Sequence, residues 1–228
     1  MANPDPTDVT APRWQRRPEA RPEEIIDAAQ HVFGENGFAR TNMEDVARLA
    51  GVSKGTVYLY FDSKDSLFRA MVRAKVVAAL TEAEEIVRGH EGPSGELLVS
   101  LIRRMYHRMR NDQMARISRL VHAELSNFPE LAKFYFEEVI LRARRLIEEV
   151  IRRGVESGEF RAVAHGFAAR GLCSLLVQTV QVQCFFHRFD PGALTEEQTL
   201  EGLIDLYLNG VLARPARPGQ PPAAPAAI

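Results

Sequence analysis

Apolar residues recur at helical rather than strand spacing along most of the chain. In the segment that begins near Pro22, Ile25, Ala29, Val32 and Phe33 fall on one face of a helix. No segment alternates apolar and polar residues for long enough to predict a strand. The pattern therefore predicts an all-α fold.

Turn and capping residues divide this pattern into about nine helices. The first is expected to end at Asn36-Gly37, the second to follow Thr41-Asn42, and the third to follow Ser53 as its N-cap. Six longer helices are expected beyond them, at about 64–88, 96–111, 113–127, 129–156, 162–187 and 195–212.

Composition divides the chain into four parts. Residues 1–20 and 214–228 are rich in proline and lack apolar periodicity, which predicts a disordered arm and a disordered tail. Residues 21–66 form a small three-helix unit, and residues 67–213 form a larger helical domain.

Two short helices joined by a tight turn are an arrangement that reads DNA. Within residues 41–61, Gly51 supplies the permissive backbone of the turn, and Val57 is expected to pack the second of the two helices against the first. The outer face of that helix then carries Lys54, Thr56, Tyr58, Leu59 and Tyr60. Lysine reaches guanine acceptors or phosphate, and threonine and tyrosine hydroxyls bond phosphate oxygens. Gly55 lets the backbone approach the duplex closely.

A longer motif surrounds this segment. It reads Gly37-Phe38-x-x-Thr41, then Met43-x-x-Val46-Ala47, then Ala50-Gly51-Val52-Ser53-x-Gly55-x-x-Tyr58-x-x-Phe61-x-x-Lys64-x-x-Leu67. This run resembles the signature of the tetracycline-repressor (TetR) family over about 45 residues, and the expected helices resemble the family's layout. One position departs from the family pattern, because Asn42 stands where serine or threonine is frequent.

The resemblance implies a helix-turn-helix DNA-binding domain and a second domain for ligand binding and dimerisation. The DNA-facing residues it implies are Thr41, Asn42, Lys54, Gly55, Thr56, Tyr58, Tyr60 and Lys64. We assign Lys54 and Tyr60 to base edges, and Thr41, Thr56, Tyr58 and Lys64 to phosphates. The expected partner is a near-palindromic operator of double-stranded DNA, bound by a homodimer.

The helix expected at 162–187 is apolar on several sides, as is typical of a helix covered both within its own subunit and by a partner. The expected dimer residues are Leu172, Leu175, Leu176, Thr179, Val182 and Phe186. Other side chains of adaptable shape or with polar tips predict a pocket for a small, mainly apolar effector. They are Met105, Tyr106, Met109, His122, Phe134, Gln178 and Gln181.

Charge and motif content narrow the function classes. The net charge is −1, and residues 1–62 hold seven basic against ten acidic side chains, so DNA binding must depend on a few well-placed cations. No nucleophile, phosphate-loop or metal-ligand motif is present, which predicts a protein that is not an enzyme and uses no cofactor or metal. Two separate cysteines, with neither a signal peptide nor a membrane span, favour the cytoplasm.

Together these features predict a homodimeric repressor released from its operator by a small apolar ligand. Two alternatives stay open at this point. The same chain could be controlled by a protein partner, or it could act as an activator.

Overall fold

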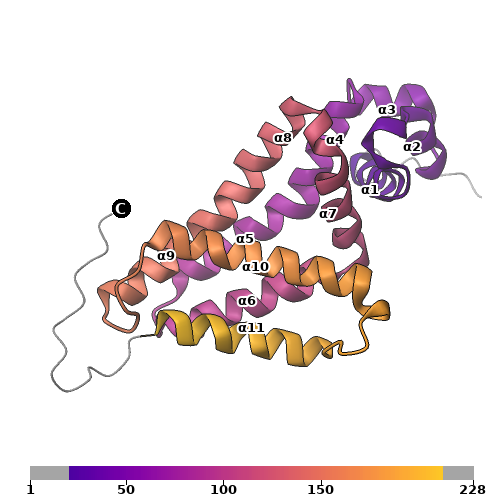
Figure 1. Cartoon of the computed structure of the whole chain (residues 1–228). Coiled ribbons are helices and arrows are strands. Elements are labelled where there is room, and N and C mark those ends of the chain that lie inside the picture. Colours follow the sequence, from indigo (N-terminus) through magenta and orange to yellow (C-terminus); the bar gives the residue numbers. More distant parts are fainter. Residues whose placement is uncertain (1–20, 213–228) are drawn as a thin grey trace, which may run out of the picture.

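The structure of this protein is a computed structural model that describes residues 21–212 (Figure 1). Helices account for all of its regular structure in that range, apart from one isolated antiparallel bridge between Phe160 and Leu212. The predicted all-α class is confirmed, and the described residues form nine continuous helices. The predicted arm at 1–20 and tail at 214–228 lie outside the described residues.

Three helices form the N-terminal end: α1 (Arg21–Arg40), α2 (Met43–Leu49) and α3 (Lys54–Tyr60). One continuous helix then comprises α4 (Lys64–Val72), the π-helical η1 (Arg73–Val77) and α5 (Ala78–Gly89), and a second comprises α8 (Pro129–Tyr135), the π-helical η3 (Phe136–Ile140) and α9 (Leu141–Glu156). The remaining elements are α6 (Ser94–Arg110), α7 (Asp112–Glu124), the 3-10 turn η2 (Leu125–Asn127), α10 (His165–Phe186), the 3-10 turn η4 (His187–Phe189) and α11 (Glu196–Val211).

Local chemistry explains the ends of the N-terminal helices. At Gly37, φ is 79° and ψ is 167°, so the helix is broken where Asn36-Gly37 predicted its end, and a short turn follows. The Asn42 carboxamide accepts the Asp45 amide at 2.8 Å, and the Ser53 hydroxyl accepts the Thr56 amide at 3.1 Å. The expected N-cap at Ser53 is confirmed, and Asn42 caps α2 in the same way.

The N-terminal helices share a core with a later part of the chain. Four aromatic rings, from Phe33, Phe38, Phe68 and Phe128, pack with centroids 4.7–5.7 Å apart, and Phe128 lies between α7 and α8. Buried residues of α7 and α8 belong to the same cluster as α1–α4. The three-helix unit is therefore packed onto the second domain, and α7 is the helix that packs against α1 (Figure 1).

A second core lies farther from α1–α3. It is built by α5, α6, α9, α10 and α11, and Tyr106, Ile147, Leu172 and Leu176 are fully buried in it. The 22-residue α10 lies across α6 and α9 in the front of Figure 1, with α11 running beside it. Among the helices of residues 21–212, none combines the length and apolar content required to cross a bilayer.

Candidate DNA-binding surface and ligand cavity

The outer face of α3 is open to solvent at the end of the molecule. Val57 is fully buried against α2, which turns the opposite side of the helix outward. Tyr58, Leu59 and Tyr60 are 44%, 77% and 37% exposed, and Lys54 and Gly55 are also exposed. The exposed methyl groups of Leu59 suit contact with a thymine methyl.

Lys54 is paired with a carboxylate that sequence reasoning missed. Its ammonium donates to a carboxylate oxygen of Glu44, at the start of α2, over 2.5 Å. This hydrogen bond and charge raise the pKa of Lys54 and lower the pKa of Glu44, so both groups are ionised at neutral pH. The cation that is expected to read DNA is therefore matched by a counter-charge in the free protein, and the ten-residue separation in sequence concealed this contact.

Substitution at this pair is expected to separate base reading from general attraction. Lys54→Ala should weaken binding to the preferred operator by roughly tenfold or more and relax base preference at one position, because a base contact disappears. Glu44→Gln, the matched control, frees Lys54 and should strengthen binding to all duplexes by a small factor. Selection from a random duplex pool, followed by anisotropy titration, measures both. An unchanged selected sequence with Lys54→Ala would remove Lys54 from base reading.

Thr41 and Lys64 require a correction, because both are occupied in holding the broken end of α1. Thr41 is 3% exposed, and its hydroxyl donates to the Gly37 carbonyl at 2.6 Å. The Lys64 ammonium donates to the carbonyls of Phe38, Ala39 and Thr41 at 2.7–3.1 Å, and it lies 4.6 Å from the centre of the Phe38 ring. These contacts replace the expected phosphate contacts with structural roles, since the polar atoms are already bonded to backbone.

The other expected DNA contacts stay candidates. Asn42 is exposed at the tip of α2 and uses its carboxamide oxygen as a cap. The Thr56 hydroxyl is hydrogen-bonded to the Ser53 hydroxyl at 2.8 Å and is partly accessible. With Lys54, Gly55, Tyr58 and Tyr60, they form one surface at the N-terminal end of the molecule, which we call the α3 face.

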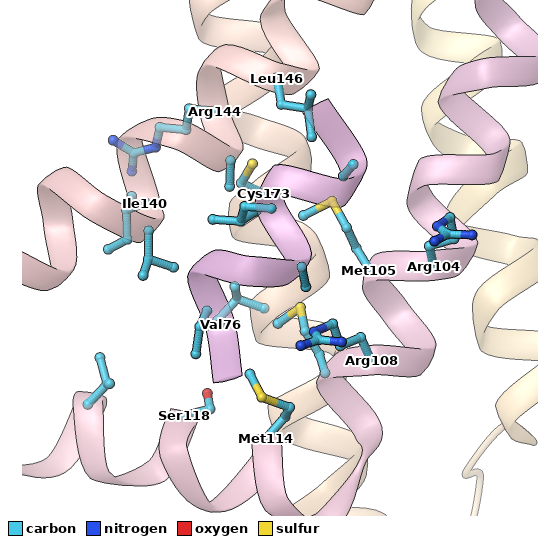
Figure 2. A pocket seen from close by; sticks show the side chains of 18 of the residues that line it. Val76, Arg104, Met105, Arg108, Met114, Ser118, Ile140, Arg144, Leu146 and Cys173 are labelled. Carbon is cyan, nitrogen blue, oxygen red and sulfur yellow. The ribbon is translucent and has the colours of Figure 1, made fainter. Parts of the chain in front are cut away.

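A cavity of about 620 Å³ lies between the two hydrophobic cores (Figure 2). Val76 and Val139 of the first core and Leu101 and Leu146 of the second contribute to its wall. This volume is within the range of small-molecule sites, roughly 300–1,000 Å³. Four of the seven residues expected in a pocket line it, namely Met105, Met109, His122 and Gln178.

The other three expected pocket residues lie elsewhere. Tyr106 is buried in the second core, where its hydroxyl donates to the Gln183 carboxamide at 2.5 Å. Phe134 is buried in the first core beneath the guanidinium of Arg69. Gln181 reaches from α10 to the ring of His122, 2.9 Å away, and is not on the cavity wall. These three assignments are corrected, because Tyr106 and Phe134 are buried in the two cores and Gln181 is directed to His122.

Sequence reasoning missed several wall residues, above all the cations Arg104, Arg108 and Arg144. Arg104 and Arg108 directly precede the expected Met105 and Met109 and repeat their four-residue helical spacing, and this was the available signal. Cys173 also lines the cavity, and burial raises the pKa of its thiol to about 11, so the thiol stays protonated.

The expected dimer residues on α10 fall into two groups. Leu172 and Leu176 are fully buried in the chain's own core, so their assignment to a partner contact is corrected. Leu175, Val182 and Phe186 are exposed along a neighbouring flank of the helix, Phe167 is exposed near its N-terminal end, and Thr179 is partly buried. On the adjacent α11, Leu206 is 67% exposed. We call this set of exposed apolar side chains on α10 and α11 the α10–α11 face.

The comparison with known families decides the identity of the fold. Residues 25–71 match the model of the bacterial regulatory proteins of the tetR family, and residues 96–209 match the model of the AefR-like transcriptional repressor C-terminal domain. The chain belongs to the TetR family. Its expected class is thus confirmed: this TetR-family protein is a DNA-binding transcriptional regulator.

Individual relatives agree with this assignment. The chain is 26% identical over 147 residues to the fatty acid metabolism regulator protein of Bacillus subtilis (strain 168), covering 64% of this chain and 73% of the relative. It is 28% identical over 160 residues to the HTH-type transcriptional repressor KstR2 of Rhodococcus jostii (strain RHA1), covering 70% and 74%. The solved structure of FadR from Bacillus subtilis in complex with stearoyl-CoA superposes with a TM-score of 0.66 at 24% identity, over 80% of this chain and 97% of that one.

Proposed function

We propose that this TetR-family protein is a homodimeric repressor that leaves a near-palindromic operator when a small, mainly apolar ligand fills the cavity. The observation that carries the proposal is that one helix, α7, lines the cavity on one side and packs against the DNA-binding unit on the other. A ligand that reshapes the cavity therefore acts directly on a support of the α3 face.

The contacts of α7 give this coupling a physical form. Met114 and Val121 line the cavity and also pack against the first core, in which Ile117 and Leu120 of the same helix are buried together with residues of α1. The Glu124 carboxylate accepts the Ala39 amide at 2.9 Å. Nearer the N-terminus of α7, Arg116 forms an ion pair with Glu35 of α1. A shift of α7 must therefore move α1, provided that the ligand binds the two arrangements unequally.

The α10–α11 face supports the dimer. Phe167, Val182 and Phe186 form a stripe along α10, and the Tyr207 hydroxyl donates to the Ala168 carbonyl at 2.9 Å, which holds α11 beside it. Large apolar side chains exposed on two neighbouring helices are typical of a subunit interface. A two-fold axis there would pair two α3 faces, and reading helices about 34 Å apart meet successive major grooves.

The character of the ligand follows from the wall of the cavity. Its lining is mainly aliphatic side chains and methionine thioethers, which accommodate an extended or irregular apolar body. The relatives point the same way, because one is named as a regulator of fatty acid metabolism and a solved structure holds stearoyl-CoA. We therefore propose a long, mainly apolar effector.

Release from the operator tests this function. Duplexes selected from a random pool are labelled, and binding is followed by fluorescence anisotropy while dodecanol is added. A coupling of about 1–3 kcal/mol, ordinary for such systems, would weaken operator binding by roughly 5- to 150-fold. Met109→Trp, which fills the cavity, should still bind the operator and lose the response. A protein that binds its operator and ignores every apolar compound would instead be a regulator controlled by a protein partner.

A further inference from the structure

The cavity carries more positive charge than an apolar ligand requires. Three guanidinium groups, from Arg104, Arg108 and Arg144, line it, and Glu82 contributes the one carboxylate on the described wall. The Nε atom of Arg144 is buried and lacks a hydrogen-bond partner among residues 21–212. Because buried donors are almost always satisfied in folded proteins, this wall favours a ligand that brings an acceptor with it.

Two of the cations lie together at an edge of the cavity that meets solvent. Arg104 and Arg108 are one helical turn apart on α6, and both are exposed. Figure 2 shows them on the same side of the cavity, with Arg144 on the other side. Met105 and Met109, the residues that follow them in sequence, also line the cavity. A ligand between α5 and α6 would thus touch thioethers and guanidinium groups at once.

The guanidinium of Arg108 is held in place before any ligand arrives. Its Nη2 atom donates to the Lys75 carbonyl at 2.5 Å. Lys75 belongs to η1, and its ammonium forms an ion pair with Asp27 of α1. Arg104 has no hydrogen bond or ion pair to another described residue, so its five N–H donors are available for a ligand.

Building on the ligand-controlled function above, we propose that the effector is an apolar anion. Its chain occupies the cavity, and its carboxylate or phosphate group is bound between Arg104 and Arg108 at the edge. Guanidinium groups bind both anions through paired N–H···O contacts, which are stronger than hydrogen bonds between neutral groups. An anion placed at this edge keeps part of its water, whereas one deep among the aliphatic side chains would lose it at a large cost in free energy.

This position connects the ligand to the DNA-binding unit by a second route. An anion that draws Arg108 toward itself competes with the Lys75 carbonyl for the same guanidinium. The contact of α6 with η1 then weakens, and η1 is tied to α1 through Asp27. A π-helical segment already departs from regular helical hydrogen bonding, so it is a suitable place for such a change.

Four ligands with one chain and different heads test the proposal on the full-length protein. We expect dodecanoate and dodecyl phosphate to bind at least about tenfold more tightly than dodecanol, and dodecyltrimethylammonium to bind more weakly than dodecanol. Isothermal titration at concentrations below micelle formation measures all four. The ratio of dodecanoate to dodecyl phosphate identifies which anion the site prefers. Equal binding of the anions and dodecanol would overturn the proposal.

Variants locate the head group. Arg104→Gln combined with Arg108→Gln should remove the preference for the anions and leave dodecanol binding unchanged. Arg103→Gln is the matched control, because this arginine lies on the same helix but is paired with Glu201 of α11, away from the cavity. Loss of the preference with Arg144→Met and not with the double variant would place the anion on the opposite wall and overturn the assignment.

The two levels of the proposal fail in different ways. If dodecanol binds and releases the operator as well as the anions do, the ligand-controlled function stands and the anion site is wrong. If the anions bind with the expected preference but never weaken operator binding, the anion site stands and the ligand-controlled function is wrong. Absence of binding by all four compounds overturns both.

Discussion

Replacing Gly37 with alanine is expected to lower the free energy of unfolding by about 3 kcal/mol or more and to weaken operator binding severely. The backbone there has φ 79° and ψ 167°, a region that only glycine adopts without strain. A Cβ atom would also collide with the Glu124 carboxylate, which would have to move. Both costs fall at the junction between α1 and α7.

The clash matters for function because Glu124 is the residue that joins these helices. Its carboxylate accepts the Ala39 amide, and a new methyl group would push it out of that hydrogen bond. The turn that leads from α1 to α2 would then lose its anchor on α7. We therefore expect the α3 face to lose its fixed orientation, with a loss of operator binding larger than the stability change alone would produce.

Thermal unfolding and operator titration measure this effect. For a chain of this size, 1 kcal/mol corresponds to a fall in Tm of roughly 2–4 °C, so we expect a decrease of about 6–12 °C. Gly158→Ala is the matched control: φ is +77°, but a Cβ there would have no neighbour within 4 Å. It should cost about 1 kcal/mol of backbone strain and leave operator binding intact. Similar Tm values for the two variants would show that the Glu124 contact contributes nothing.

A charge on the α11 part of the α10–α11 face is expected to have the largest effect on DNA binding. Leu206→Glu places a carboxylate where the proposed two-fold axis would bury it, and each dimer would contain two such charges. Leu206 is 67% exposed in the single chain, so the substitution should not disturb the fold of the subunit. Glutamate also retains helix propensity close to that of leucine.

The consequence for the operator follows from losing the paired reading helices. A monomer binds one half-site, and the gain from joining two binding units is about 10²–10⁴-fold. We expect sedimentation to show half the wild-type mass and anisotropy to show operator affinity reduced by at least about a hundredfold. Leu194→Glu, at a site 54% exposed in the loop before α11, is the control and should remain dimeric. A monomeric wild-type protein with full operator affinity would contradict the proposed assembly.

Much of the N-terminal unit could be predicted because its determinants are local. The caps at Asn42 and Ser53 act on amides three residues later, and the break at Gly37 depends on its own backbone angles. Their effects are visible in a short stretch of sequence. The alternation of buried Val57 with exposed neighbours on α3 follows from helical spacing in the same way.

The roles of charged and polar side chains were less predictable, because their partners are distant in sequence. Lys64 bonds to carbonyls more than 20 residues earlier, and Lys54 pairs with Glu44 across the turn. Their residue types suit phosphate contact equally well, so sequence could not decide between the two roles. Tyr106 was expected in the pocket for its residue type, but the packing of α6 against α10 places it in the core.

The amino-acid sequence by itself determined the helical class, the ends of the N-terminal helices and the DNA-reading motif, since these depend on spacing and capping within a few residues. Only the tertiary structure decided which side of α10 is buried, which arginines reach the cavity and which lysine is committed to the backbone. Those outcomes depend on how helices far apart in the chain pack together, and similar residues on one helix become core, cavity wall or free surface according to the neighbour they meet.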